Sequence, residues 1–249
     1  MNKSWTDEQV SQHATAAKLC VKVMHESFES IRVNSNISEY AVQQFIISKY
    51  KEYGMVSDND PPIVAFRANT SFVHYFPEES SAKKLEPNSL IMIDLWARLD
   101  EKDAPYADIT WIAWHGGMVP KEVQKGFDTI LQSRDSCVDY IRDSLSGGND
   151  ILLNKDIAKS MEGIVLDSGL QDFLPHSFGH SLGLTSCHGT HGIFLQSSKS
   201  TLVKNVGYTI EPGIYIEGEY GFRSEIDFYV DKSGKLVLST EAQKKMELV

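Results

Sequence analysis

The chain has 249 residues and a formal net charge of −10, with 41% hydrophobic and 23% charged residues. These proportions are typical of a soluble globular protein whose core needs no disulfide support. The acidic balance argues against a nucleic-acid-binding surface. Three scattered cysteines argue against a disulfide framework or a thiolate zinc site. We find no secretion signal and no apolar run of membrane length, so we expect a cytoplasmic protein.

Two amphipathic helices are predicted at the start of the chain. Thr6 and Gln9 form a capping-box pattern, and apolar residues then recur at steps of four and three up to Ile31. Ser38 is a suitable N-cap for a second helix, and Gly54 is a suitable end. The period then changes to two, which predicts strands over residues 62–66, 72–75, 90–97 and 106–114.

The same order of elements repeats in the second half. Helices are predicted over residues 121–145 and 154–169, and strands over 178–184, 207–211, 213–217 and 222–230. No linker rich in proline, glycine or serine divides the two halves. We therefore expect one α+β domain over residues 1–249, in which helices cover one face of a mostly antiparallel sheet in each half. Two such halves facing each other would leave a cleft between their sheets.

A stretch rich in histidine runs from Pro175 to His191 and contains four histidines and three glycines. Neutral histidine is both a metal ligand and a base near pH 7, so this density indicates a metal or proton-transfer site. Cys187 lies beside His188, which suggests a thiol nucleophile. No oxyanion elbow or orienting partner accompanies it, and a small packed residue is the simpler interpretation.

Acidic residues occur inside segments that otherwise predict buried strands. Asp94 lies in one apolar strand, and Asp108 and Thr110 share a face of the next strand. The polar turn between them, residues 98–105, predicts a hairpin. A carboxylate in such a strand is costly unless it is paired, hydrogen-bonded or bound to a metal.

The C-terminal part supplies further carboxylates. Glu211 ends a strand just before a Pro-Gly turn, and Arg223, Glu225 and Asp227 share one face of another strand. With Asp94, Asp108 and His180, the carboxylates of Glu211 and Glu225 make a donor set that favours divalent ions such as Mn, Co, Fe or Zn. Two ions bridged by carboxylates can lower the pKa of a water molecule and polarise a carbonyl.

Several segments together resemble the pita-bread (M24-type) metallopeptidases, which include methionine aminopeptidase, aminopeptidase P, prolidase and the creatinase relatives. These segments are NTSFVHY, IDLWA with YADIT, GHSLGL with CHG, TIEPGIY and RSEIDFYV. The resemblance extends over nearly the whole chain. It implies the pita-bread fold and hydrolysis of a peptide bond near the N-terminus of a peptide, with two divalent ions as cofactors.

The resemblance also implies a role for each site residue. Asp108 and Glu225 would bridge the two ions, and Glu211 would accept the proton of the attacking water. The complete set of implied metal ligands is Asp94, Asp108, His180, Glu211 and Glu225. His74 and His188 match the two histidines that contact substrate and stabilise the tetrahedral intermediate. The step from His180 to His188 is one residue longer than in the family, which leaves His191 as a rival.

The substrate class rests on two further residues. His176 and Arg223 resemble features of the aminopeptidase P and prolidase branch, which acts on Xaa-Pro bonds. An apolar ledge for the proline ring would come from Trp96, Trp111 or Phe178. Methionine aminopeptidase remains the alternative, because we expect a compact protein without the extra N-terminal domain common in the proline-specific branch. A creatinase-like C–N hydrolase and a catalytically silent binding module also remain open. The expected partner is a peptide substrate, with no nucleic acid or membrane, and a homodimer is left open.

Overall fold

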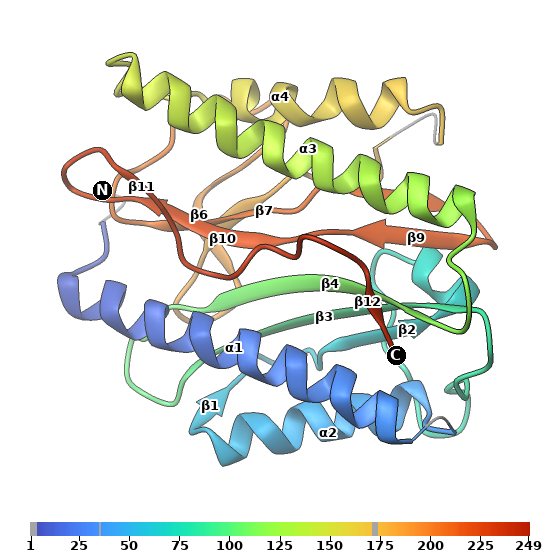
Figure 1. Ribbon diagram of the computed structural model, residues 1–249. Helices are drawn as coiled ribbons and strands as arrows, with labels where there is room; N and C mark the ends of the chain where they lie inside the picture. The colour runs from blue at the N-terminus through green and yellow to red at the C-terminus, as the bar shows by residue number, and fades with distance from the viewer. Residues whose placement is uncertain (1–3, 35, 171–173) are drawn as a thin grey trace.

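Two layers of helices enclose two β-sheets in the computed structural model, which describes residues 4–34, 36–170 and 174–249 (Figure 1). Helices α1 (Asp7–Val33) and α2 (Glu39–Glu52) cover one sheet. Helices α3 (Lys121–Ser146) and α4 (Asn154–Asp167) cover the other. The predicted α+β arrangement of two similar halves is confirmed. No helix in the described ranges is both long and apolar enough to cross a membrane.

The first sheet has the order β1-β3-β4-β12, and β2 also pairs with β3. Its strands are β1 (Met55–Val56), β2 (Ile63–Phe66), β3 (Ser89–Leu99), β4 (Ala107–His115) and β12 (Glu247–Leu248). The second sheet has the order β11-β10-β7-β5-β6. Its strands are β5 (His180–Leu182), β6 (His188–Ile193), β7 (Gly207–Ile210), β10 (Ile226–Val230) and β11 (Leu236–Leu238). A separate hairpin joins β8 (Gly213–Ile216) to β9 (Tyr220–Arg223).

The helix starts follow the predicted capping residues. The Gln9 N–H donates to Thr6 Oγ1 at 3.1 Å, and the Thr6 N–H donates to Gln9 Oε1 at 2.9 Å, which completes the capping box. Ser38 Oγ accepts the Ala41 N–H at 3.1 Å. Gly54 follows α2 with φ 65°, a left-handed conformation that glycine adopts without strain. These local signals position both helices of the first half.

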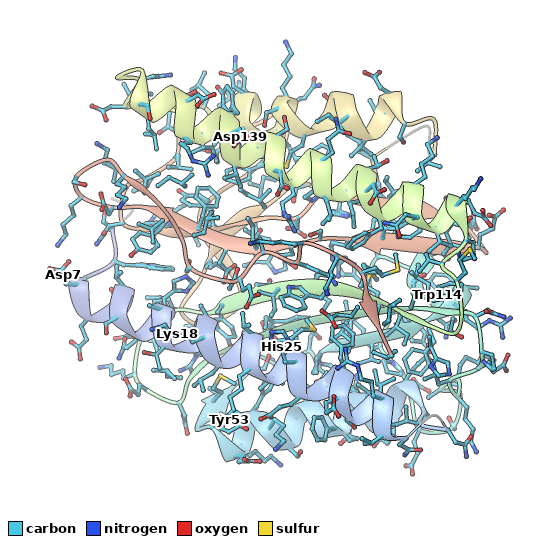
Figure 2. The ribbon with its side chains drawn as sticks, viewed as in Figure 1. Asp7, Lys18, His25, Tyr53, Trp114 and Asp139 are labelled. Atoms are coloured by element: carbon cyan, nitrogen blue, oxygen red, sulfur yellow. The ribbon has the colours of Figure 1, made fainter. Side chains whose placement is uncertain are left out.

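Strand β3 is buried on both faces, so its side chains divide between two hydrophobic cores. Ile91 and Ile93 pack with residues of α1 and α2, whereas Leu90 and Met92 pack with residues of the second half. Side chains fill the spaces between helices and sheets (Figure 2). By the alternation of a strand, Asp94 shares the face of Met92 and therefore points between the two halves.

The predicted strand over residues 72–75 is wrong. A short 3₁₀ helix, η1 (Arg67–Ser71), is followed there by irregular chain. The rings of Phe72 and Tyr75 stack with centroids 6.4 Å apart, and the Tyr75 hydroxyl donates to the buried carboxylate of Glu39 at 2.7 Å. This segment is thus held by contacts of its side chains, because its backbone is not paired in a sheet.

The strand elements of the C-terminal half are also shorter and more numerous than predicted. The segment 178–184 contributes only β5, whose register with β6 shifts between His180 and Leu182. The sequence did not predict β6, β11 or β12. Strand β12 pairs in parallel with β4, and the Val249 N–H donates to Trp114 O at 3.0 Å. Such short strands carry too little alternation to be detected by period alone.

Helix α3 packs so closely on β9 that one glycine has no room for a side chain. A Cβ on Gly126 would lie 2.4 Å from Cε2 of Phe222, which is fully buried. Gly126→Ala should therefore lower the free energy of unfolding by about 1–3 kcal/mol, the usual cost of overpacking. Chemical denaturation measures this change.

The matched control is Gly163→Ala in α4, because nothing lies within 4 Å of a Cβ at that position. There alanine should raise the free energy of unfolding by roughly 0.5–1 kcal/mol, since it is the better helix former. Equal stabilisation by both alanines would contradict the close contact between α3 and β9.

Candidate active site

A cavity of about 250 Å³ receives side chains from both sheets. Its wall includes all nine residues that were predicted from the sequence to be metal ligands, catalytic groups or substrate contacts. They are His74, Asp94, Asp108, His176, His180, His188, Glu211, Arg223 and Glu225. Residues that are up to 151 positions apart in the sequence thus meet in one place.

The β3–β4 hairpin places two carboxylates on one face. Its antiparallel register pairs Asp94 with Thr110 and Trp96 with Asp108, so the two aspartates are diagonal neighbours. They are only 7% and 6% exposed. In the part of the chain that the structure describes, Oδ1 of each has no hydrogen-bond partner. Buried carboxylate oxygens without a donor are costly, and a cation would satisfy them.

His180 lies at the start of β5 with its ring held in one orientation. Its Nδ1 is 3.0 Å from Ser181 O, and because a carbonyl only accepts, Nδ1 carries the proton. The unprotonated Nε2 then faces Asp108 Oδ2 at 3.7 Å and Glu211 Oε1 at 3.6 Å. Burial, with the nearby His188, lowers the pKa of His180 to about 3. A neutral imidazole fixed in this way is prepared to bind a metal.

Glu225 lies between β9 and β10, in the second half, and is held by hydrogen bonds to β4 of the first sheet. The Thr110 hydroxyl donates to Glu225 Oε2 at 2.7 Å, and the Glu225 N–H donates to Thr110 O at 3.1 Å. Two residues further on, Asp227 Oδ2 accepts the Asp108 N–H at 2.9 Å. These bonds join the two halves of the molecule at the cavity and fix the separation of their carboxylates.

Three overlapping groups could hold a metal ion, each with its ligand atoms within 4.8 Å of one another. The groups are Asp94–Asp108–Glu225, His180–Glu211–Glu225 and Asp108–His180–Cys187. The first two share Glu225 and together contain all five ligands implied by the resemblance. The residues present therefore fit a pair of divalent ions with hard oxygen donors and one imidazole.

The carboxyl groups are crowded enough to oppose their own ionisation. Burial and then the charge of neighbouring carboxylates raise the pKa of Asp108 and of Glu225 well above their usual range. Burial raises the pKa of Glu211 to about 8, although the Arg223 guanidinium opposes this shift. Without cations, the site therefore retains protons near neutral pH.

The histidines implied to contact substrate lie on the exposed side of the cavity. The ring of His188 lies 4.1 Å from that of His180, centroid to centroid, and His188 lines the cavity. His191 is not among the described residues that line it, so the geometry favours His188 over its rival. His74 also lines the cavity, from the irregular chain after η1, where its neighbour Tyr75 is held by Glu39.

Arg223 is buried and occupied by protein groups. It forms an ion pair with Asp94, its Nε donates to Thr110 Oγ1 at 3.0 Å, and its Nη1 donates to the Tyr215 hydroxyl at 2.9 Å. Tyr215 is also 3.0 Å from His176 Nε2. The sequence reasoning missed Tyr215, although it lies in the TIEPGIY segment. Arg223 thus contacts one carboxylate directly and Glu225 through Thr110.

Two other residues at the cavity were not expected to take part. Cys187 Sγ donates to Asp108 Oδ2 at 3.0 Å, so the thiol lies among the ligand atoms at the edge of the core of the second half. Asp58 accepts the Cys187 N–H at 3.1 Å and the Trp96 Nε1–H at 2.8 Å. The only signal for Cys187 was its place directly before His188, and nothing in the sequence pattern singled out Asp58.

The predicted apolar ledge is partly wrong. Trp96 lines the cavity, but Trp111 packs in the core beneath α1 because its odd position places it on the other face of β4. Phe178 is buried in the other core and is not among the described lining residues. The apolar side chains that accompany Trp96 in the cavity wall are Ile63, Val73 and Phe76.

The metal-free protein should lose stability as the pH rises from about 7 to about 8, where histidines of the unfolded chain are already mostly neutral. The folded protein keeps a proton on Glu211, whose pKa is about 8, that the unfolded chain has lost, so the stability this proton gives is lost as pH rises through that value. The raised pKa values of Asp108 and Glu225 act in the same direction. Glu211 alone contributes roughly 1 kcal/mol over this interval. Chemical denaturation at each pH measures the slope.

Two variations test the cause of that slope. Glu211→Gln removes one titrating group and should make the slope shallower. Saturating Mn²⁺ should abolish or reverse it, because ligation favours ionised carboxylates. Stability that is constant or rises over this interval in the metal-free protein would contradict the proton-retaining site.

Comparison with known proteins agrees with this geometry. A family model described as metallopeptidase family M24 matches residues 11–232. The chain is 27% identical over 233 residues to YkvY of Bacillus subtilis (strain 168), covering 94% of this chain and 59% of that protein. It is 25% identical over 235 residues to an uncharacterised peptidase of Staphylococcus aureus (strain USA300), covering 94% and 62%. The chain thus spans about three fifths of the length of these relatives.

Solved structures share the architecture. A prolidase from Thermococcus sibiricus superposes with a TM-score of 0.84 and 22% identity, over 98% of this chain and 62% of that one. An X-Pro aminopeptidase from Thermotoga maritima MSB8 gives a TM-score of 0.85 and 21% identity, over 99% and 64%. These similarities confirm the pita-bread fold. Since the family model extends over most of the sequence, the chain belongs to metallopeptidase family M24.

Proposed function

We propose that this chain hydrolyses peptide bonds near the N-terminus of a peptide and depends on two divalent metal ions. One observation carries the proposal: two ligand groups that share Glu225 converge on a single cavity, where Asp94 and Asp108 present buried oxygens that no described group satisfies. Such buried oxygens are costly unless protons or cations satisfy them, and here they lie beside an imidazole and further carboxylates that can complete a metal site. Family membership supports the same chemistry.

The ions, when bound, supply an activated water and polarise the carbonyl of the scissile bond. The residues of this chain supply the proton transfers. Glu211 follows β7 and precedes Pro212, so its carboxylate is held at the end of a strand beside the ligand atom of His180. We assign it the role of general base, which takes the proton of the attacking water and passes it to the leaving amine.

His74 and His188 provide the substrate side of the reaction. Both line the cavity, and both are exposed, in contrast to the buried ligands. Burial and the nearby guanidinium of Arg223 lower the pKa of His74. We assign these histidines to binding the substrate carbonyl and to stabilising the negative charge that develops on it, as donors aimed at an oxyanion do.

For substrate class, we propose Xaa-Pro bonds. An X-Pro bond has no N–H to satisfy and presents a rigid apolar ring. Trp96, Ile63, Val73 and Phe76 give the cavity an apolar side against which such a ring could pack. His176 remains a candidate substrate contact, whereas Arg223 fits the role of positioning Asp94 and Glu225, because it is only 3% exposed. The related solved structures include a prolidase and an X-Pro aminopeptidase.

We also propose that the protein works in the reducing cytoplasm, because all three of its cysteines are free thiols. Cys20, Cys137 and Cys187 are all buried, and none is paired in a disulfide. In a reducing compartment the thiol of Cys187, which lines the cavity, stays unoxidised.

The division of roles between ligands and substrate residues can be tested with two alanine variants. Asp108→Ala should lose metal and activity together, because its carboxylate belongs to two of the ligand groups. His74→Ala should retain both ions but lower kcat by about 10²–10³-fold, the usual cost of removing one oxyanion donor. Elemental analysis and steady-state kinetics measure the two effects. Loss of metal from His74→Ala would show that the assignment is wrong.

The substrate proposal is tested by comparing kcat/KM on Xaa-Pro and Met-Ala peptides at equal metal loading. We expect the higher value on Xaa-Pro peptides, by at least ~10-fold, because even one methylene in an apolar pocket is worth about 1–3 kcal/mol. Apo protein reconstituted separately with Mn, Co, Fe and Zn identifies the most active metal. A higher value on Met-Ala peptides would favour methionine aminopeptidase. Absence of turnover on both classes, with metal bound, would favour a binding module.

A further inference from the structure

We propose that Cys187 is a metal ligand, and that it makes one of the two metal positions a mixed site of sulfur, nitrogen and oxygen that selects zinc-like ions. The inference rests on the metal centre of the proposed function. Neither the resemblance nor the five-ligand set includes a thiolate. The ion that Cys187 would bind is a borderline or soft divalent cation such as Zn²⁺, Co²⁺ or Cd²⁺.

The position of the sulfur atom is the first observation. Sγ of Cys187 is 3.0 Å from Asp108 Oδ2, which in turn is 3.7 Å from His180 Nε2. One ligand atom from each of these three residues lies within 4.8 Å of the other two. Cys187 is buried, with 2% of its surface exposed, yet it lines the cavity rather than packing away from it.

A second observation is a buried carboxylate oxygen at the same position that no described group satisfies. Oδ1 of Asp108 is buried and has no hydrogen-bond partner among the described residues, although Oδ2 accepts the thiol. The thiol proton therefore satisfies only one of the two oxygens. A divalent ion between Asp108, His180 and Cys187 would satisfy the carboxylate and the imidazole lone pair together.

The backbone of Cys187 is held on both sides, which fixes the position of its Cβ at the cavity. Its N–H donates to Asp58 Oδ2 at 3.1 Å, and its carbonyl accepts the Gly183 N–H at 2.9 Å. Asp58 is itself held by Trp96 Nε1–H at 2.8 Å. A Cβ on Gly183 would lie 2.2 Å from Ser186 O, which shows how tightly this turn is closed. Such supporting contacts are what fix a ligand before the metal arrives.

Binding forms one metal–sulfur bond, and the thiol proton passes to water. The two metal positions then differ in character. Asp94, Asp108 and Glu225 offer only hard oxygen ligands, which suit manganese, whereas Cys187 and His180 offer a thiolate and an imidazole, which suit zinc or cobalt. The structure therefore predicts a centre whose two positions prefer different ions.

The test is a titration of the metal-free full chain with Co²⁺, followed by absorption. A cobalt–thiolate bond gives a sulfur-to-metal charge-transfer band in the near ultraviolet, which oxygen and nitrogen ligands do not give. We expect the band in the wild-type protein, its loss in Cys187→Ser and its retention in Cys137→Ser, a change at a buried cysteine of α3. Retention in a Cys20→Ala/Cys137→Ala variant, whose only thiol is Cys187, makes the assignment independent of whether Cys187→Ser folds.

Affinity provides a second readout without activity. Cys187→Ser should weaken Cd²⁺ binding by at least ~10-fold, the lower range for losing a supporting residue of a metal site. Mn²⁺ binding should change by less than about 3-fold, because manganese gains little from a thiolate. Co²⁺ binding without the charge-transfer band, or equal losses for Cd²⁺ and Mn²⁺, would overturn this inference and leave the proposed peptidase intact. Failure of the wild-type chain to bind any of these ions would overturn both.

Discussion

Buried negative charge is the constraint on which the rest of this structure depends. Asp94, Asp108 and Glu225 are each at most 7% exposed and line one cavity, and Glu211, which also lines it, is nearly as buried. Asp227 is fully buried behind them and accepts the Asp108 N–H. Moving several carboxylates out of water costs far more than a few hydrogen bonds return. Among the described residues, Arg223 supplies a positive charge to this cluster, because it forms a buried ion pair with Asp94. The remaining charge must be met by protons or by bound cations, and the raised pKa values of Asp108 and Glu225 express that need.

The same groups also join the two halves of the molecule. Thr110 on β4 exchanges hydrogen bonds with Glu225, and the backbone of Asp108 donates to Asp227. Each half is a sheet covered by its own pair of helices, so the separation between halves is set where β4 meets the segment that leads into β10. Metal binding at this junction would therefore act on folding as well as on chemistry, because a cation bound only by the folded state stabilises it.

The sequence predicted those parts of the molecule whose signals are local or strongly periodic. The capping box at Thr6, the long helices and the β3–β4 hairpin follow from such signals. All nine candidate residues line the cavity, but their assignment came from resemblance to a family, because the period of a strand gives a face and not a partner strand. Trp111 shows the limit. It is aromatic and follows Thr110 directly, but neighbouring residues of a strand point to opposite faces, so Trp111 packs in the core beneath α1 and α2. Cys187 and Tyr215 were missed because their significance lies in contacts with Asp108 and Arg223, which no local pattern encodes.

The ligands and the substrate residues are supported by different kinds of structure. Asp94, Asp108 and His180 lie within strands, and Glu211 directly follows one. Close packing fixes the backbone beneath His180, since a Cβ on Gly179, whose φ is 156°, would lie 2.3 Å from Thr209 O. His74, in contrast, lies on irregular chain held mainly through Tyr75 and Glu39. Irregular chain on a rigid scaffold tolerates change in sequence and length better than the strands beneath it. The metal centre should therefore vary little among relatives with this fold, whereas substrate preference can change through the segment around His74 without altering the strands that hold the ligands.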